Sequence, residues 1–324
     1  MQPRPTRTVI LHHMGSEADD GTGATPPGAN LRMKIPVLTA ILIGLAAVAP
    51  GATQAAPVLR TDQVRVVYAD PQDPKHEQIR EAMQERRILE LLRTLLSPYR
   101  LPRPLTLEVK GCDGKVDAYY NDDVATLCYE YVELIQRHAP KVATPGGVTR
   151  ADAIVGAILD TLLHEAGHAV IDMLEIPVMG REEDAADFFS AYILLQFAPE
   201  DAQRLVQGVG FMMASEAREA LEQRPRVEMF AGVHGLPAQR YFNLLCMAYG
   251  SNPKTFANLV AGGLPARRAG NCDEEYAMLK RAFGKLILPH VDEKLQREAF
   301  AEVRFGWSPL ATAADSFDKA PLAE

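Results

Sequence analysis

Residues 149–174 read TRADAIVGAILDTLLHEAGHAVIDML, and this stretch decides how the rest of the chain is interpreted. Thr149 and Asp152 form the T-x-x-D pattern of a helix N-terminal capping box, so we expect a long helix to begin here. The helix should run to about Leu174, because Pro177-Val178-Met179-Gly180 then interrupts the chain. A second helix is expected to fold back onto the first after this turn.

Inside the long helix, His164, Glu165 and His168 make the pattern H-E-x-x-H. Histidines at i and i+4 lie one turn apart on the same helical face, so both imidazoles can reach one zinc ion. Glu165 is adjacent to the first histidine, where its carboxylate can act as general base on a metal-activated water. The flanking residues are uncharged, and polar groups in such a helix need partners. We therefore predict one zinc ion per chain.

Carboxylates that support this site follow on the next helix, which we expect from Arg181 or Glu182 to Phe197. Glu183 and Asp187 make E-x-x-x-D, and Glu183 can complete a zinc site of two histidines and one glutamate. Asp187 can accept a hydrogen bond from the non-ligating nitrogen of a histidine ligand. Glu182 is the main rival as third ligand. Two other interpretations stay open: the carboxylates satisfy the histidines without a metal, or they only favour a helix N-terminus.

These motifs resemble those of zincin metallopeptidases of the gluzincin type, in which H-E-x-x-H is followed by E-x-x-x-D on a second helix. Thr161 and the uncharged flanks match the extended motif, whereas residues 169–174 lack the further glycine and histidine of metzincins. More narrowly, most of residues 60–290 resemble an uncharacterised family of secreted bacterial metallopeptidases. This likeness is carried by Cys112 with Cys128-Tyr129-Glu130, HEAGH at 164–168, GREEDAADFF at 180–189, Gln239-Arg240, Leu245-Cys246 and Tyr249-Gly250.

The resemblance implies a zincin fold and, by analogy, peptidase chemistry. In gluzincins a tyrosine or histidine from the helical second half stabilises the oxyanion, which makes His234, Tyr241 and Arg240 the candidates here. His234 lies between Ala231-Gly232-Val233 and Gly235, in a segment that we expect to form a loop facing the cleft or the solvent. Among the other histidines, His290 is a weaker candidate, and solvent-facing helix positions are expected for His76 and His138.

The order of elements predicts an α+β fold, with a small N-terminal sheet and helices followed by a helical second half. Strands are expected at 64–68 and 105–109, and two strand pieces at 117–120 and 125–129 flank an Asn-Asp-Asp turn. Residues 117–128 are the candidate edge strand beside the cleft, where an extended substrate would pair. Further helices are expected at 75–96, 131–138, 201–223, 237–249, 253–261 and 273–287.

The first 56 residues are expected to lie outside the folded domain. Met33-Lys34, an apolar run at 35–48 and small residues up to Ala55 or Ala56 follow the order of a secretory signal peptide. Translation would then begin at Met33, with 1–32 an untranslated or disordered extension; the alternative is a buried apolar helix after a disordered tail. The apolar run is too short for a stable membrane anchor. We expect an exported, periplasmic or extracellular protein.

A single metallopeptidase domain is expected over 57–308, with a sheet-containing part at 57–178, a helical part at 180–308 and a flexible tail at 309–324. Export makes disulfides the expected state of the four cysteines. Three pairings are possible, and we favour the shortest loops, Cys112–Cys128 and Cys246–Cys272. A metal site at these cysteines is disfavoured, because no pair has C-x-x-C spacing.

Composition limits the remaining function classes. The 324 residues are 47% hydrophobic with a net charge of −8, which excludes a wholly disordered chain and argues against nucleic-acid binding. We therefore predict a secreted zinc peptidase that acts on peptide or protein substrates. The alternatives are a non-catalytic module that keeps the metallopeptidase fold and a zinc amidase that acts on cell-wall peptides. Glu165 favours an enzyme, because a structural zinc site has no use for a carboxylate there.

Overall fold

The computed structural model describes residues 63–224 and 226–305, which all belong to one unit of the chain, Pro57–Glu324. The predicted extension at 1–32, the predicted signal peptide at 33–56 and the predicted tail at 309–324 lie outside the described residues. The first half contains β1 (Val64–Tyr68), α1 (Glu77–Glu85), α2 (Ile88–Leu96), β2 (Leu105–Lys110), β3 (Ala118–Asn121), β4 (Val124–Cys128), α3 (Tyr129–His138) and α4 (Arg150–Met173). The second half contains α5 (Glu182–Leu194), α6 (Pro199–Glu222), α7 (Pro237–Ser251), α8 (Asn258–Ala261), α9 (Ala266–Ala269), α10 (Cys272–Leu286) and α11 (Glu293–Glu302).

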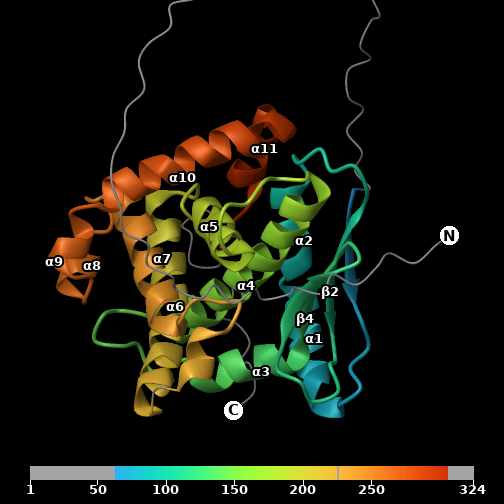
Figure 1. Ribbon diagram of the computed structural model, residues 1–324. Helices are drawn as coiled ribbons and strands as arrows, with labels where there is room; N and C mark the ends of the chain where they lie inside the picture. Colours follow the sequence, from blue (N-terminus) through green and yellow to red (C-terminus); the bar gives the residue numbers. More distant parts are fainter. Residues whose placement is uncertain (1–62, 225, 306–324) are drawn as a thin grey trace, which may run out of the picture. The chain divides into compact units, whose positions relative to one another are not determined.

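The four strands form one mixed sheet in the order β1-β2-β4-β3 (Figure 1). β1, β2 and β4 are parallel, whereas β3 is the outer strand and pairs antiparallel with β4. The turn between β3 and β4 has only two residues, Asp122 and Asp123, and both have positive φ, at 49° and 65°. A two-residue turn of this kind matches the twist of the flanking strands, and aspartate tolerates the left-handed conformation.

One face of the sheet is buried because apolar and polar residues alternate along β2. Leu105, Leu107 and Val109 are fully buried, and the residues between them are half-buried. The long helix α4 contacts β3 and β4 on one side and packs against α5 and α6 on the other. Its length and composition would allow it to cross a membrane, but 83% of its apolar window is buried in the protein, as in the core helix of a globular domain.

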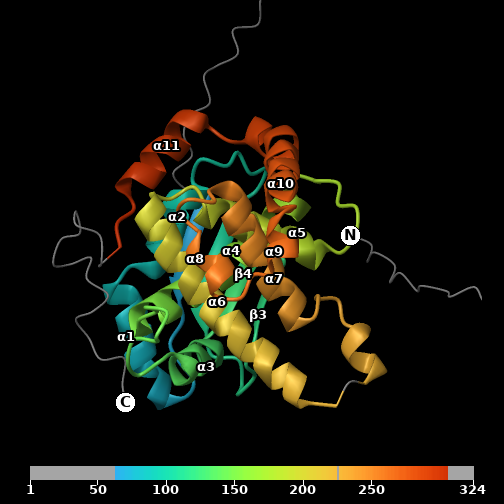
Figure 2. The same ribbon diagram turned by 90° about the vertical axis from the view of Figure 1, so that its left-hand side faces the viewer.

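The helical half is built around α6 and α7, which pack against each other (Figure 2). α6 also packs against α4, and α7 against α5 and α10. Glycine permits a close approach of α4 and α6, because a Cβ atom on Gly208 would lie 1.8 Å from the backbone oxygen of Asp152. The Cys246–Cys272 disulfide joins α7 to α10. The Cys112–Cys128 disulfide joins the end of β4 to the loop after β2, so both bonds are the short-loop pairs that the sequence favoured.

The predicted α+β fold, with a small sheet and a helical second half, is confirmed. The strands lie where they were expected, and the Thr149–Asp152 capping box at the start of α4 is present. α6, α7 and α10 agree with their predicted spans to within about two residues. α3 begins two residues earlier than predicted.

The single helix expected at 75–96 is wrong. Arg87 adopts a left-handed conformation with φ 54°, which divides the segment into α1 and α2. The break lets the Leu89 backbone N–H donate to the hydroxyl of Tyr68 on β1 at 2.9 Å, so packing against the sheet overrides the helical pattern. The expected helix to Phe197 ends at Leu194 because Pro199 starts α6. The helix expected at 253–261 shrinks to α8, and α11 had not been predicted.

Candidate metal centre

His164 and His168 lie one turn apart on the inner side of α4. Their rings meet edge to face with centroids 4.8 Å apart, and their Nε2 atoms are 3.2 Å from each other. His164 is buried and His168 half-buried, because α5 folds back over this part of α4. A close approach at Gly167 allows this packing, since a Cβ atom there would lie 3.2 Å from the Ala186 Cα on α5.

The outer nitrogen of each histidine is bound to a different carboxylate of α5. His164 Nδ1 lies 2.8 Å from Asp187 Oδ1, and His168 Nδ1 lies 2.9 Å from Glu182 Oε1. A carboxylate only accepts hydrogen bonds, so each Nδ1 carries a proton. In the neutral tautomer that results, both Nε2 atoms present lone pairs to the space between the rings.

A third lone-pair donor, Glu183 Oε2, reaches the same point. It lies 3.2 Å from His164 Nε2 and 3.3 Å from His168 Nε2. Three acceptor atoms that face one another repel unless a cation lies between them. The arrangement therefore calls for a metal ion, or for a second proton on one of the rings.

The three separations suit a tetrahedral zinc ion. Zinc with ligands at about 2.0–2.1 Å has ligand atoms about 3.3–3.4 Å apart along each edge of the tetrahedron. The observed separations of 3.2, 3.2 and 3.3 Å match one triangular face of it. The donor set of two imidazoles and one carboxylate is also typical of catalytic zinc, which keeps a fourth position for water or substrate.

His234 lies at the same point, on the loop between α6 and α7. Its Nε2 is 2.7 Å from Glu183 Oε2, its ring stacks on His164 at 5.9 Å, and its side chain is 49% exposed. Partial burial lowers the pKa of His234, which favours the neutral ring. The structure thus brings His234 to the candidate centre. Tyr241 is not brought there: it packs beside Phe242 and is absent from the described lining of the pocket.

Glu165 lines a pocket together with His164 and His234. The residue is only 6% exposed, and no other described residue donates a hydrogen bond to its carboxylate. Burial raises the pKa of Glu165. A carboxylate with an elevated pKa and no bound donor is suited to accept a proton from a substrate or water.

Arg240 of α7 holds Asp187 rather than facing the pocket as an isolated cation. Its Nε and a terminal nitrogen contact the two carboxylate oxygens of Asp187 at 2.8 and 2.7 Å. Burial would raise the pKa of Asp187, but the hydrogen bonds from Arg240 and His164 keep it well below its usual range. The sequence suggested Arg240 as a candidate oxyanion donor; in the structure two of its nitrogens contact Asp187, which in turn contacts His164.

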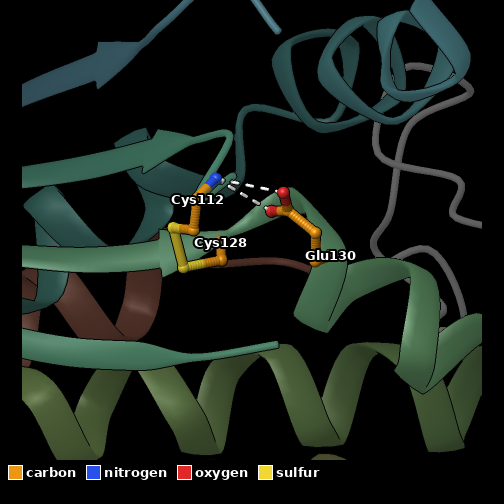
Figure 3. Close-up of side chains that lie close together, drawn as sticks. All are labelled: Cys112, Cys128 and Glu130. Carbon is orange, nitrogen blue, oxygen red and sulfur yellow. Dashed lines mark hydrogen bonds between the residues drawn. A yellow bond between two sulfur atoms is a disulfide. The ribbon is translucent and has the colours of Figure 1, made fainter. Parts of the chain in front are cut away.

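The loop that leads into β3 borders the pocket and is clamped at its start (Figure 3). Buried Glu130, at the start of α3, accepts hydrogen bonds from the backbone N–H groups of Cys112 at 3.1 Å and Gly114 at 2.9 Å. The Cys112–Cys128 disulfide closes the same loop, so these sulfur atoms are bonded to each other and are not metal ligands. The clamp fixes residues 116–118, which line the pocket.

The other histidines within the described residues, His76, His138 and His290, lie apart from the candidate centre. His76 had been expected to face solvent, but it is 1% exposed and its Nε2 lies 3.2 Å from Glu133 of α3. His138 is half-buried with its Nδ1 3.5 Å from Glu219, and neither it nor His290 lines the described pocket.

Sequence reasoning missed the role of Glu182, which it treated only as a rival ligand. Each of the two histidines needs an acceptor for its outer nitrogen, and besides Glu183 the start of the second helix offers three acidic residues, Glu182, Asp184 and Asp187. That count was the available signal.

One protein family, described as "Putative metallopeptidase", matches residues 68–287, about two thirds of the chain. The matched region contains α1 to α10 and every residue of the candidate centre. No curated protein and no solved structure matches the chain.

Proposed function

Because the chain belongs to this metallopeptidase family, we propose that it is an exported zinc peptidase of the gluzincin type. His164, His168 and Glu183 are the proposed zinc ligands, with Asp187 and Glu182 holding the two histidines. The observation that carries the proposal is the convergence of three lone-pair atoms within 3.3 Å of one another, each histidine already bound to a carboxylate on its far side.

When bound, zinc would polarise the substrate carbonyl and lower the pKa of a water molecule. Glu165 would accept the proton from the attacking water and pass it to the leaving amine. Its position on the pocket wall and its raised pKa support this role. His234 is the preferred donor to the developing oxyanion, because it is the histidine of the second half that reaches the candidate centre.

An extended peptide fits the surroundings of the site better than a compact substrate does. β3 is one of the two edge strands of the sheet, and the residues that lead into it line the pocket. An extended chain would add to this edge by backbone hydrogen bonds. The two disulfides fit a protein that folds in an oxidising compartment, which agrees with export.

The first test is metal content. The protein would be produced with its own leader in an oxidising compartment and analysed by elemental mass spectrometry. About one zinc ion per chain is expected, and His164→Ala should lose it. A chain that binds no zinc after reconstitution with excess metal would mean that protons, not a metal, satisfy the histidines.

Three further variants test which carboxylate is the third zinc ligand and whether Glu165 is the general base. Glu182→Ala removes only a positioning partner, which costs about 10–100-fold in metal affinity. Glu183→Ala removes a proposed ligand and should weaken zinc affinity at least about tenfold more. The reverse order would reassign the third ligand. Glu165→Gln should keep the zinc and lose peptide hydrolysis. If the zinc-loaded wild type cleaves no peptide, the non-catalytic alternative takes precedence.

A further inference from the structure

The candidate centre opens into a pocket of about 210 Å³ between α4, α6 and α7. His164, Glu165 and His234 form one end of it. An apolar wall follows, made by Val209, Met212 and Met213 of α6. On this volume scale about 10–15 Å³ holds one water molecule, so the pocket has room for one long side chain of a substrate bound at the centre.

The pocket also contains acidic groups that the proposed chemistry does not use. Glu216, one turn beyond the methionines on α6, and Asp160, one turn before His164 on α4, both line it. Asp160 accepts a hydrogen bond from Ser190 at 2.6 Å, and no other described side chain donates to it. No described side chain donates a hydrogen bond to Glu216.

The charges in this pocket do not cancel. Arg240 is the one lysine or arginine among the described lining residues, and it is bound to Asp187 through two of its nitrogens. Glu165 and Glu183 would balance a divalent ion at the candidate centre. Asp160, Glu216 and Asp117, which also lines the pocket, together outnumber the single guanidinium of Arg240, so the pocket keeps an excess of negative charge. Burial raises the pKa of both Asp160 and Glu216, to about 6 for Asp160.

We propose that this pocket selects peptides with a lysine or arginine side chain next to the scissile bond, an inference that rests on the peptidase function proposed above. The aliphatic stem would lie on Val209, Met212 and Met213, in the way that long basic side chains bury their methylene groups. The cationic head would reach Glu216 and Asp160, where charge-assisted hydrogen bonds form in a partly dry site. Specificity for a basic residue then comes from Glu216, which accepts no hydrogen bond from a described side chain, and from Asp160, which accepts only that of Ser190.

The test compares peptide pairs that differ only in charge. Zinc-loaded full-length wild type is assayed with lysine against norleucine, and with arginine against citrulline, on each side of the scissile bond. On one side, kcat/KM should be at least about tenfold higher for the charged member, as expected for a hydrogen bond to a charged group. Equal values for both members on both sides would overturn the proposal and leave the peptidase function intact.

If no peptide is cleaved, the affinity of the protein for the same peptides tests the inference instead. The same peptides are then titrated against zinc-loaded Glu165→Gln by fluorescence anisotropy. Tighter binding of the lysine peptide than of the norleucine peptide supports the pocket even where the peptidase function has failed. Equal binding overturns it.

Variants on α6 test which residue produces the preference for a basic side chain. Glu216→Gln should reduce the lysine-to-norleucine preference to about twofold or less, and Glu216→Lys should reverse it in favour of glutamate. Glu219→Gln is the matched control on α6, because Glu219 faces His138 and is absent from the described pocket lining. The control should keep the wild-type preference. A preference that survives Glu216→Lys would refute the assignment.

Discussion

Replacing Arg240 by methionine tests how the centre is held together. Methionine has a similar length, but the substitution removes both nitrogens that contact Asp187 at 2.7 and 2.8 Å. The Asp187 carboxylate, whose side chain is 17% exposed, then keeps only His164 as a hydrogen-bond donor among the described residues. Breaking a buried ion pair from one side costs about 3–5 kcal/mol. Because both side chains retain some exposure, we expect about 3 kcal/mol.

The free energy of unfolding would be measured by urea titration of the zinc-free protein with its disulfides intact. The double variant Asp187→Asn with Arg240→Met removes both charges and should lose at least about 1.5 kcal/mol less than the sum of the two single variants. Arg181→Met is the matched control. Arg181 binds Asp184 on the surface, with 45% of its side chain exposed, and its loss should cost below about 1 kcal/mol.

The same variants separate stability from metal binding. Arg240 contacts Asp187, which in turn contacts the proposed ligand His164, so loss of this support in Arg240→Met should weaken zinc affinity, by less than Asp187→Asn does. An Arg240→Met protein as stable as Arg181→Met, or strictly additive losses in the double variant, would refute the reasoning that Arg240 holds Asp187.

Three further outcomes follow. Gly208→Ala should destabilise the protein by at least about 3 kcal/mol, because its Cβ would overlap the backbone of α4. Gly284→Ala is the control in the same thermal or urea melt; its Cβ meets no neighbouring atom, so it should be neutral or slightly stabilising. Burial raises the pKa of Asp160 to about 6, so its ionisation is disfavoured in the folded state. As pH rises from below 4 to above 6, the free energy of unfolding of the zinc-free wild type should fall by about 3 kcal/mol relative to that of Asp160→Asn. Parallel pH profiles of the two proteins would contradict this. Replacing both Cys112 and Cys128 by serine opens a 16-residue loop and should cost about 3 kcal/mol in urea unfolding; an unchanged midpoint would show that the Glu130 contacts alone hold the loop.

The features that the sequence determined by itself are those that depend on neighbours along the chain. The capping box at Thr149 and Asp152 and the shared face of His164 and His168 follow from the period of a single helix. The Asn-Asp-Asp turn predicted the β3–β4 hairpin, because few residues other than glycine, asparagine and aspartate accept positive φ. The two short-loop disulfides also join segments close in sequence.

The contacts that only the tertiary structure decided lie between elements whose relative placement no local pattern encodes. Arg240 reaches Asp187 across 53 residues because α7 packs against α5, and Glu182 rather than Asp187 meets His168 because of how α5 crosses α4. Arg87 breaks a continuous helical pattern so that α2 can pack on β1. Glu216 reads as one more polar residue of α6 until that helix lies against α4 and turns it toward the pocket. Helical periodicity fixes which residues share a face, whereas the packing of one helix on another decides what that face meets.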